Sequence, residues 1–164
     1  LMEQVILMCG PAGSGKSTHA RMLERAGYVL LSFDAEAWEL GHRNHPLSAE
    51  VMQTIHEQLQ VRLTELVSRG ARVVVDTSFW SRISRDRYRD LLAPLGVTPT
   101  VYYLDTPRDV LLRRLGARIN AGPDDVHVPA EQALAYLDGF QRPSPDEGPL
   151  RIIRHEPDTL RLPG

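Results

Sequence analysis

The feature that most constrains this chain is a glycine-rich segment near its start. The segment reads Gly10-Pro11-Ala12-Gly13-Ser14-Gly15-Lys16-Ser17 and matches the pattern G-x-x-x-x-G-K-[ST] at every fixed position. An apolar run at residues 5–9 precedes it, and a helical pattern at 16–26 follows it. A strand, a glycine turn and a helix in this order direct backbone N–H groups at phosphate oxygens. We therefore predict a nucleotide phosphate site at residues 10–17.

The side chains at the fixed positions of this loop each have a chemical task. Glycines let the backbone wrap closely around the phosphates. Lys16 is expected to reach the β- and γ-phosphates, and the hydroxyl of Ser17 to bind Mg²⁺. Lys16 is the single lysine among 19 basic residues, so a compact ammonium has been kept where it must fit beside phosphate oxygens. We also expect Thr18 to belong to the nucleotide site.

Strand and helix patterns alternate along the chain. Apolar or β-branched runs predict strands at residues 5–9, 28–33, 72–76, 99–104 and 150–153. Helical periodicity is present at residues 16–26, 48–70, a stretch ending before Pro94, 107–115 and 129–140. Residues 35–47 have no regular pattern. The alternation predicts an α/β fold of three layers, a parallel sheet with helices on both faces.

The length and the polar segments predict the domain organisation. A chain of 164 residues is sufficient for one domain with a full core, so we expect a single domain over 1–164. The polar stretch at about 114–128 contains Gly122 and Pro123 and is expected to form a lid. Three prolines and a glycine within 143–149 predict a linker, which makes 143–164 a linker and tail.

Two of the predicted strands are followed by an aspartate with a candidate role. Ligands of parallel sheets bind at the carboxyl ends of the strands, where Asp34 and Asp76 lie. Asp34 is expected to accept the proton of an attacking hydroxyl; the alternative is a helix cap before Ala35, and Glu36 is a weaker candidate for the same base. Asp76 is expected to orient Mg²⁺ or its water, or to contact the acceptor, with a loop cap as the alternative.

Arginines supply the other candidate site residues. Arg114 and Arg118 are four residues apart, so they share a helix face, and they are expected to close over ATP and neutralise the transferring phosphoryl group. The alternative for both is a solvated helix end. One of Arg82, Arg85 and Arg87 is a candidate for an anionic acceptor. Trp38, His42 and His45 lie in the segment best placed to cover an acceptor.

Composition and charge exclude several other classes of protein. The formal net charge of −2 gives no overall positive field for nucleic acid. Cys9 is the single cysteine, which excludes an intrachain disulfide and suits a cytoplasmic protein. No apolar run approaches the ~20 residues of a membrane helix, so we expect no membrane partner. The Asn-Lys-x-Asp motif of guanine recognition is absent, which favours ATP over GTP.

Taken together, these residues resemble the small P-loop kinases, AAA-type ATP-binding proteins related to the kinase domain of phage polynucleotide 5′-kinase. The resemblance rests on the Walker A loop, on Asp34, on the strand end at 73–78 and on the stretch 114–118, and it covers roughly residues 4–140. Chloramphenicol phosphotransferase and zeta toxins are more distant relatives of this group. The resemblance implies about five strands in the order 2-3-1-4-5 and a lid.

The resemblance also implies roles for two residues and a class of acceptor. It makes Asp34 the general base and Arg118 the residue that stabilises the transition state. In the polynucleotide kinase an arginine follows the base by a few residues, whereas residues 34–38 contain none here. This difference favours a small hydroxylated acceptor over a polynucleotide 5′ end.

The sequence therefore predicts an ATP-dependent kinase, a phosphotransferase that uses Mg²⁺ and moves the γ-phosphoryl group to a hydroxyl of a small-molecule acceptor. Two alternatives remain open. A polynucleotide 5′-hydroxyl kinase would need a basic channel built from Arg43, Arg82, Arg85 and Arg87. A nucleotide-binding ATPase or switch would have no acceptor pocket.

We expect the substitution Lys16→Ala to abolish turnover of ATP, because the variant loses the ammonium that contacts the β- and γ-phosphates. The measurement is product formation from labelled ATP by the purified variant and the wild type. Turnover at the wild-type level by the variant would refute the assignment of Lys16.

Overall fold

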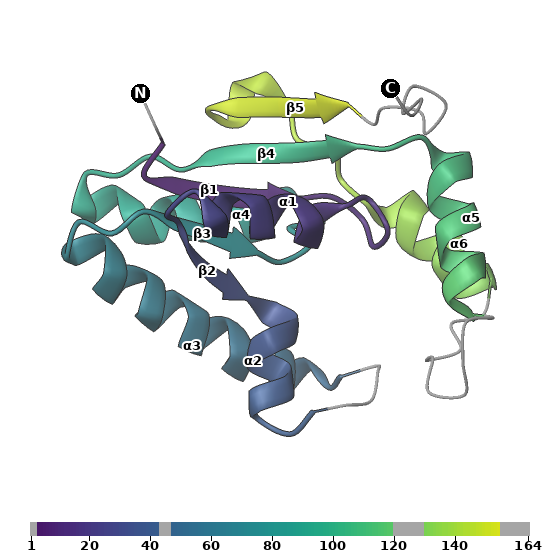
Figure 1. Ribbon diagram of the computed structural model, residues 1–164, viewed down its shortest axis with the longest axis horizontal. Coiled ribbons are helices and arrows are strands. Elements are labelled where there is room, and N and C mark those ends of the chain that lie inside the picture. Colours follow the sequence, from purple (N-terminus) through teal and green to yellow (C-terminus); the bar gives the residue numbers. More distant parts are fainter. Residues whose placement is uncertain (1–2, 43–46, 120–129, 155–164) are drawn as a thin grey trace.

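The computed structural model describes residues 3–42, 47–119 and 130–154. These residues contain a five-stranded sheet in the order β2-β3-β1-β4-β5 (Figure 1). The four neighbouring pairs are all parallel. The strands are β1 Val5–Cys9, β2 Val29–Ser32, β3 Val73–Asp76, β4 Thr100–Asp105 and β5 Leu150–Arg154. The predicted α/β class and the order 2-3-1-4-5 are confirmed.

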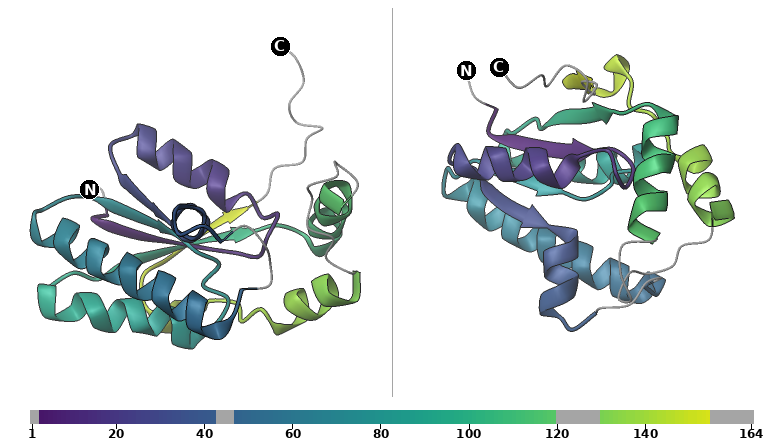
Figure 2. Two further views of the ribbon diagram at one scale, coloured as in Figure 1. Left: turned by 90° about the horizontal axis from the view of Figure 1, so that it is seen from below. Right: turned by 45° about the vertical axis from the view of Figure 1, so that its right-hand side comes forward.

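Helices cover both faces of this sheet. They are α1 Lys16–Arg25, α2 Phe33–Glu39, α3 Ala49–Ser68, α4 Arg82–Leu92, α5 Arg108–Ile119 and α6 Ala130–Gly139, with 3₁₀ turns η1 Ala93–Leu95 and η2 Pro145–Glu147. α1 lies on one face, whereas α3 and α4 lie on the other (Figure 2). α5 and α6 lie beyond the carboxyl ends of the central strands (Figure 1). No helix in the described ranges is both long enough and apolar enough to span a membrane.

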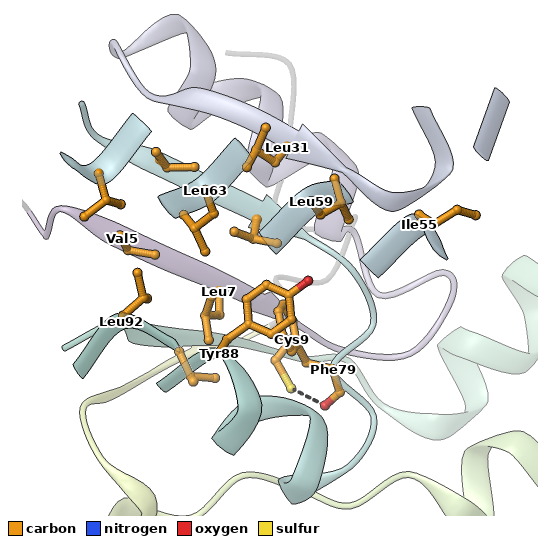
Figure 3. Packing of buried hydrophobic residues seen from close by; sticks show 14 of the residues in the cluster. Val5, Leu7, Cys9, Leu31, Ile55, Leu59, Leu63, Phe79, Tyr88 and Leu92 are labelled. Carbon is orange, nitrogen blue, oxygen red and sulfur yellow. Dashed lines mark hydrogen bonds between the residues drawn. The ribbon is translucent and has the colours of Figure 1, made fainter. Parts of the chain in front are cut away.

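The core is organised around β1, whose five residues are all buried. Side chains alternate across a strand, so Val5, Leu7 and Cys9 enter one hydrophobic cluster while Ile6 and Met8 enter the other. Figure 3 shows the first cluster, which includes residues from α3, α4 and the neighbouring strands. Because both faces are covered, β1 is an uninterrupted apolar run, as expected of a central parallel strand.

The strand register brings polar residues together at one edge of the sheet. Asp76, the last residue of β3, lies opposite Met8 of β1 and opposite Ser32 of β2. Gly10 follows β1 closely, and Phe33 begins α2 directly after Ser32. The glycine loop, Asp76 and the first turn of α2 therefore meet at the carboxyl ends of three adjacent strands.

The structure differs from the sequence prediction in two segments. Part of the stretch 35–47, expected to be irregular, belongs to α2, whose cap is Ser32 and whose buried residue is Ala37. A helix of seven residues is too short to show a clear apolar repeat. It is stabilised by its cap and its packing. Residues 143–149, expected to form a linker, contain η2 and the buried Pro143, and the chain then joins the sheet as β5.

We expect Leu63→Ala to lower the free energy of unfolding by about 2–5 kcal/mol, because it leaves a cavity in the core. Leu63 of α3 is 0% exposed. Val61, on the same helix, is 58% exposed, so Val61→Ala is a matched control that should change stability by less than about 0.5 kcal/mol. Urea denaturation followed by circular dichroism measures both. Equal losses in the two variants would contradict this description of the core.

Candidate functional site

The loop between β1 and α1 is a tight backbone cradle. Gly13 and Gly15 have φ of +85° and +96°, a region that residues with a Cβ rarely adopt. Gly15 is also the N-cap of α1, so the loop ends at the positive end of a helix. A Cβ on Gly10 would lie 2.6 Å from Ser14 Oγ. The loop therefore needs glycine for its shape at these positions.

Neighbouring elements hold the outside of this cradle. Gly10 N donates to the carbonyl of Ser78 at 3.2 Å. Thr106 Oγ1 donates to the Ser14 carbonyl at 3.1 Å, and Arg114 Nη1 donates to the Gly13 carbonyl at 2.6 Å. Two carbonyl oxygens of the loop are thus bound by donors from outside it. The Ser14 hydroxyl is buried without a hydrogen-bond partner among the described residues.

These observations show that the residues present fit the phosphate groups of a nucleotide. The loop requires glycines, ends at a helix N-terminus and contains a buried polar atom without a partner. The side chain of Lys16, the first residue of α1, is half-buried and lies close enough to act on the charge of Asp76. A loop of this kind binds an anion through backbone donors, a helix dipole and one ammonium.

Ser17 and Asp76 form a contact that joins the cradle to β3. Ser17 Oγ donates to Asp76 Oδ2 at 3.0 Å. Burial raises the pKa of Asp76, the Lys16 ammonium and the Ser17 hydrogen bond oppose this rise, and the charge of Asp34 adds to it. A buried carboxylate next to a hydroxyl is an oxygen pair suited to Mg²⁺, which fills its other positions with water and phosphate.

Asp34 lies in the first turn of α2, where its side chain is exposed. The cap of this helix is Ser32, whose hydroxyl accepts from the backbone N–H of Ala35 at 3.2 Å. The alternative role of Asp34 as the helix cap is therefore wrong. Asp34 is close enough to raise the pKa of Asp76 electrostatically, so the two carboxylates lie near each other.

Glu36, the other acid proposed for the role of base, is placed differently. Its side chain is 14% exposed and pairs with Arg62 of α3 at 3.6 Å. The carboxylate is thus directed at α3, whereas Asp34 is exposed in the same turn of the helix. The structure therefore brings Lys16, Ser17, Asp34 and Asp76 together and leaves Glu36 in a helix contact.

Of the two arginines predicted to cover ATP, Arg114 contacts the cradle directly through Gly13. Arg118 is part of α5, but its side chain lies outside the described residues, as do residues 120–129 of the predicted lid. Trp38 is exposed on α2, and His42 is partly buried just after it. His45 and Arg43 also lie outside the described residues.

The structure assigns other contacts to the arginines after β3. Arg85 is buried and pairs with Glu147 at 2.9 Å, so it is not available to an acceptor or to a basic channel. Arg82 pairs with Asp86 at 3.6 Å and with Asp146 at 3.3 Å. Arg87 remains exposed on α4. Of the three arginines considered for an anionic acceptor, Arg85 is therefore excluded, because its charge is already compensated inside the protein.

Sequence reasoning missed two residues that shape the site. Thr106 follows β4 directly and binds the cradle; its place after a strand end is a signal that could have identified it. Glu147 is separated from its partner Arg85 by 62 residues and lies in a proline-rich stretch. No local pattern marks such a residue as buried.

We expect Asp76→Asn to weaken binding of Mg·ATP more than binding of ATP in EDTA, because the carboxylate charge serves the cation. Asp105→Asn is the matched control, since Asp105 also ends a strand but pairs with Arg142 at 3.2 Å. Calorimetric titration of the wild type and both variants measures the six affinities. Equal weakening with and without Mg²⁺ would show that Asp76 acts only on the loop.

Comparison with known proteins shows which of them share this architecture. A protein-family model described as an AAA domain matches residues 5–143. No curated protein matched the chain. A putative kinase from Chloroflexus aurantiacus j-10-fl superimposes with a TM-score of 0.73 and 22% identity, over 99% of this chain and 93% of that one.

Two further solved structures have the same fold. A sugar kinase from Janibacter sp. HTCC2649 gives a TM-score of 0.67 and 20% identity, over 99% of this chain and 88% of that one. The APS kinase of Mycobacterium tuberculosis, solved with AMPPNP and APS, gives a TM-score of 0.62 and 22% identity, over 95% of this chain and 89% of that one. At these identities the likeness is one of fold. Because the family model spans residues 5–143, the chain belongs to the AAA domain family, and its fold is that of the P-loop kinases.

Proposed function

We propose that this protein is an ATP-dependent phosphotransferase that moves the γ-phosphoryl group to a hydroxyl of a small-molecule acceptor. The observation that carries the proposal is the meeting of three groups at one sheet edge. These are the glycine cradle with Lys16, the Ser17–Asp76 pair, and the exposed carboxylate of Asp34 on the adjacent strand end. A phosphate site facing an exposed acid is the arrangement that transfer to a hydroxyl requires.

In the proposed reaction, the Asp34 carboxylate accepts the proton of the acceptor hydroxyl. The hydroxyl oxygen forms a bond to the γ-phosphorus, and the bond from this phosphorus to the β–γ bridging oxygen breaks, which releases ADP. Lys16 and the backbone N–H groups of the loop stabilise the charge on the phosphate oxygens. When bound, Mg²⁺ would neutralise further charge there; Ser17 and Asp76 are the residues that would hold it. Arg114 keeps the loop in shape, and Arg118 is proposed to act on the transferred group.

The described charges support a small acceptor rather than a polynucleotide. A basic channel leading to Asp34 would need several free arginines, but Arg85 is buried in an ion pair and Arg82 is paired with two aspartates. The formal net charge of −2 agrees with this. Among structures of the same fold, one is described as a sugar kinase, which supports testing sugars and other polyols first.

A phosphoryl-transfer screen tests the proposal. The purified protein is incubated with ATP labelled at the γ-phosphate, Mg²⁺ and panels of sugars, nucleosides, antibiotics and oligonucleotides with a 5′-hydroxyl. Label in a small molecule supports the proposal. Label only in the oligonucleotides would favour a polynucleotide kinase, and phosphate release without any labelled acceptor would favour an ATPase or switch.

We expect Asp34→Asn to retain the affinity for Mg·ATP and to lose transfer by about 10²- to 10⁴-fold, because it removes the base but not the cradle. Glu36→Gln should transfer normally, since this acid is engaged with Arg62. Glu39→Gln, an exposed acid at the end of the same helix, is the matched control. The measurement is the initial rate of phosphoryl transfer by each variant to the acceptor found in the screen. Normal transfer by Asp34→Asn would remove the assignment, and loss in Glu36→Gln would move it to Glu36.

A further inference from the structure

Arg85 of α4 is a completely buried charged residue outside the phosphate cradle. Its Nε and Nη2 donate to Glu147 Oε1 and Oε2 at 2.9 and 3.1 Å. Its Nη1 donates to two backbone carbonyls, those of Phe79 and Gln141, both at 2.8 Å. One guanidinium thus joins three segments: the loop after β3, the chain after α6, and η2.

The loop after β3 has an unusual backbone at the point where Arg85 binds. Phe79 has a φ of +47°, a conformation that is rare for a bulky residue and persists only when the surroundings impose it. Its carbonyl accepts from Arg85 Nη1 and also from Cys9 Sγ at 3.5 Å (Figure 3). Two donors on one carbonyl oxygen hold that carbonyl in place.

This loop connects directly to the phosphate cradle. It begins at Asp76, which binds Ser17, and the carbonyl of Ser78 accepts from Gly10 N. A shift of the Phe79 carbonyl would therefore act on residues on both sides of the cradle. Asp34 follows β2, the strand that pairs with β3, so this loop and Asp34 begin at neighbouring strand ends.

The chain after α6 is attached to the same loop. Gln141 N donates to the Trp80 carbonyl at 2.7 Å, and Arg82 N donates to Gln141 Oε1 at 2.9 Å. Glu147 is itself held, because Ser144 N donates to its Oε2 at 2.9 Å and Arg89 Nη1 to its Oε1 at 3.2 Å. Burial would raise the pKa of Glu147, but the hydrogen bonds from Arg85, Ser144 and Arg89 lower it to about 2, so the pair stays ionised at neutral pH.

A buried ion pair is not in itself evidence of a contribution to stability. Apolar side chains of similar volume often replace a buried ion pair without loss of stability. What they cannot replace is the donation to two backbone carbonyls, for which the guanidinium has enough N–H groups in a fixed plane. A lysine has a single nitrogen and cannot reach the carboxylate and both carbonyls together. A substitution that keeps the volume of Arg85 but removes these donors therefore distinguishes a packing role of this residue from a positioning role.

We propose that Arg85, held by Glu147, is a positioning residue for phosphoryl transfer. It fixes residues 77–80, and through them the position of Asp76 and of the neighbouring sheet edge, where the acceptor is proposed to bind, relative to the phosphate cradle. The inference rests on the proposed function, because the transfer reaction is what the position serves. It also makes the segment from Gln141 to Glu147 a structural part of the site.

Two variants and a control test the inference. Arg85→Lys keeps a positive charge beside Glu147 but loses the planar set of donors. The double variant Arg85→Met/Glu147→Met removes both charges and keeps apolar volume. Arg108→Gln is the control, because Arg108 forms an exposed ion pair with Asp138 at 2.6 Å. For each protein the measurements are Tm, the affinity for Mg·ATP, and kcat and KM for transfer to the acceptor from the screen.

A second readout does not need an acceptor. The chain has two tryptophans, so Trp38→Phe leaves Trp80, next to Phe79, as the single fluorescent indole. Quenching of Trp80 by acrylamide then reports on the loop. In this background we expect stronger quenching for both Arg85 variants and no change for Arg108→Gln.

The expected result is a kcat about 10- to 100-fold lower in both Arg85 variants, because a small displacement of residues 77–80 misaligns the reacting groups. The affinity for Mg·ATP should fall by a smaller factor, through the displaced Asp76. Tm should fall in both variants, because each leaves buried carbonyl groups without a donor. A double variant with wild-type Tm, kcat and quenching would overturn the inference. Failure of both variants to fold would also overturn it, in favour of a purely structural pair.

The outcomes separate this inference from the proposed function. If the wild type labels no acceptor at all, the proposed function fails. In that case unchanged quenching of Trp80 in the Arg85 variants would overturn the positioning of the loop, and increased quenching would support it.

Discussion

β1 is buried on both faces and paired on both edges, with β3 on one side and β4 on the other. A strand in this position cannot slip by one residue, because every side chain would exchange one core for the other. Its end is therefore fixed in the middle of the carboxyl edge of the sheet, and the glycine loop opens there. The phosphate cradle is thus positioned by hydrophobic burial, before any ligand binds.

The two carboxylates at this edge have different surroundings, which suits different tasks. Asp76 is buried, accepts from the Ser17 hydroxyl and feels the Lys16 ammonium. Asp34 is exposed in the first turn of α2, beyond the cap that Ser32 provides. An acid held by the protein is suited to a cation, whereas an exposed acid nearby is free to receive a proton. Adjacent strands in register are what bring these two acids together.

The loop after β3 depends on contacts between residues that are distant in the sequence. The loop after Asp76 takes its shape from Arg85, and Arg85 in turn is held by Glu147, 62 residues further along the chain. Gln141 ties the chain after α6 to the same loop. Segments that meet only in the folded chain therefore set the position of this loop beside the phosphate cradle.

Sequence alone determined the cradle at residues 10–17, the parallel sheet and the two strand-end acids, because glycine turns, β-branched runs and strand ends are local patterns with local causes. Tertiary structure decided the rest. α2 forms because Ser32 caps a short helix and Ala37 is buried. Arg85 is excluded as a ligand of an acceptor because Glu147 compensates its charge inside the protein. The physical reason is that a charged side chain is buried only where a group of opposite charge compensates it. The position of that group is determined by the folded chain and not by the local sequence.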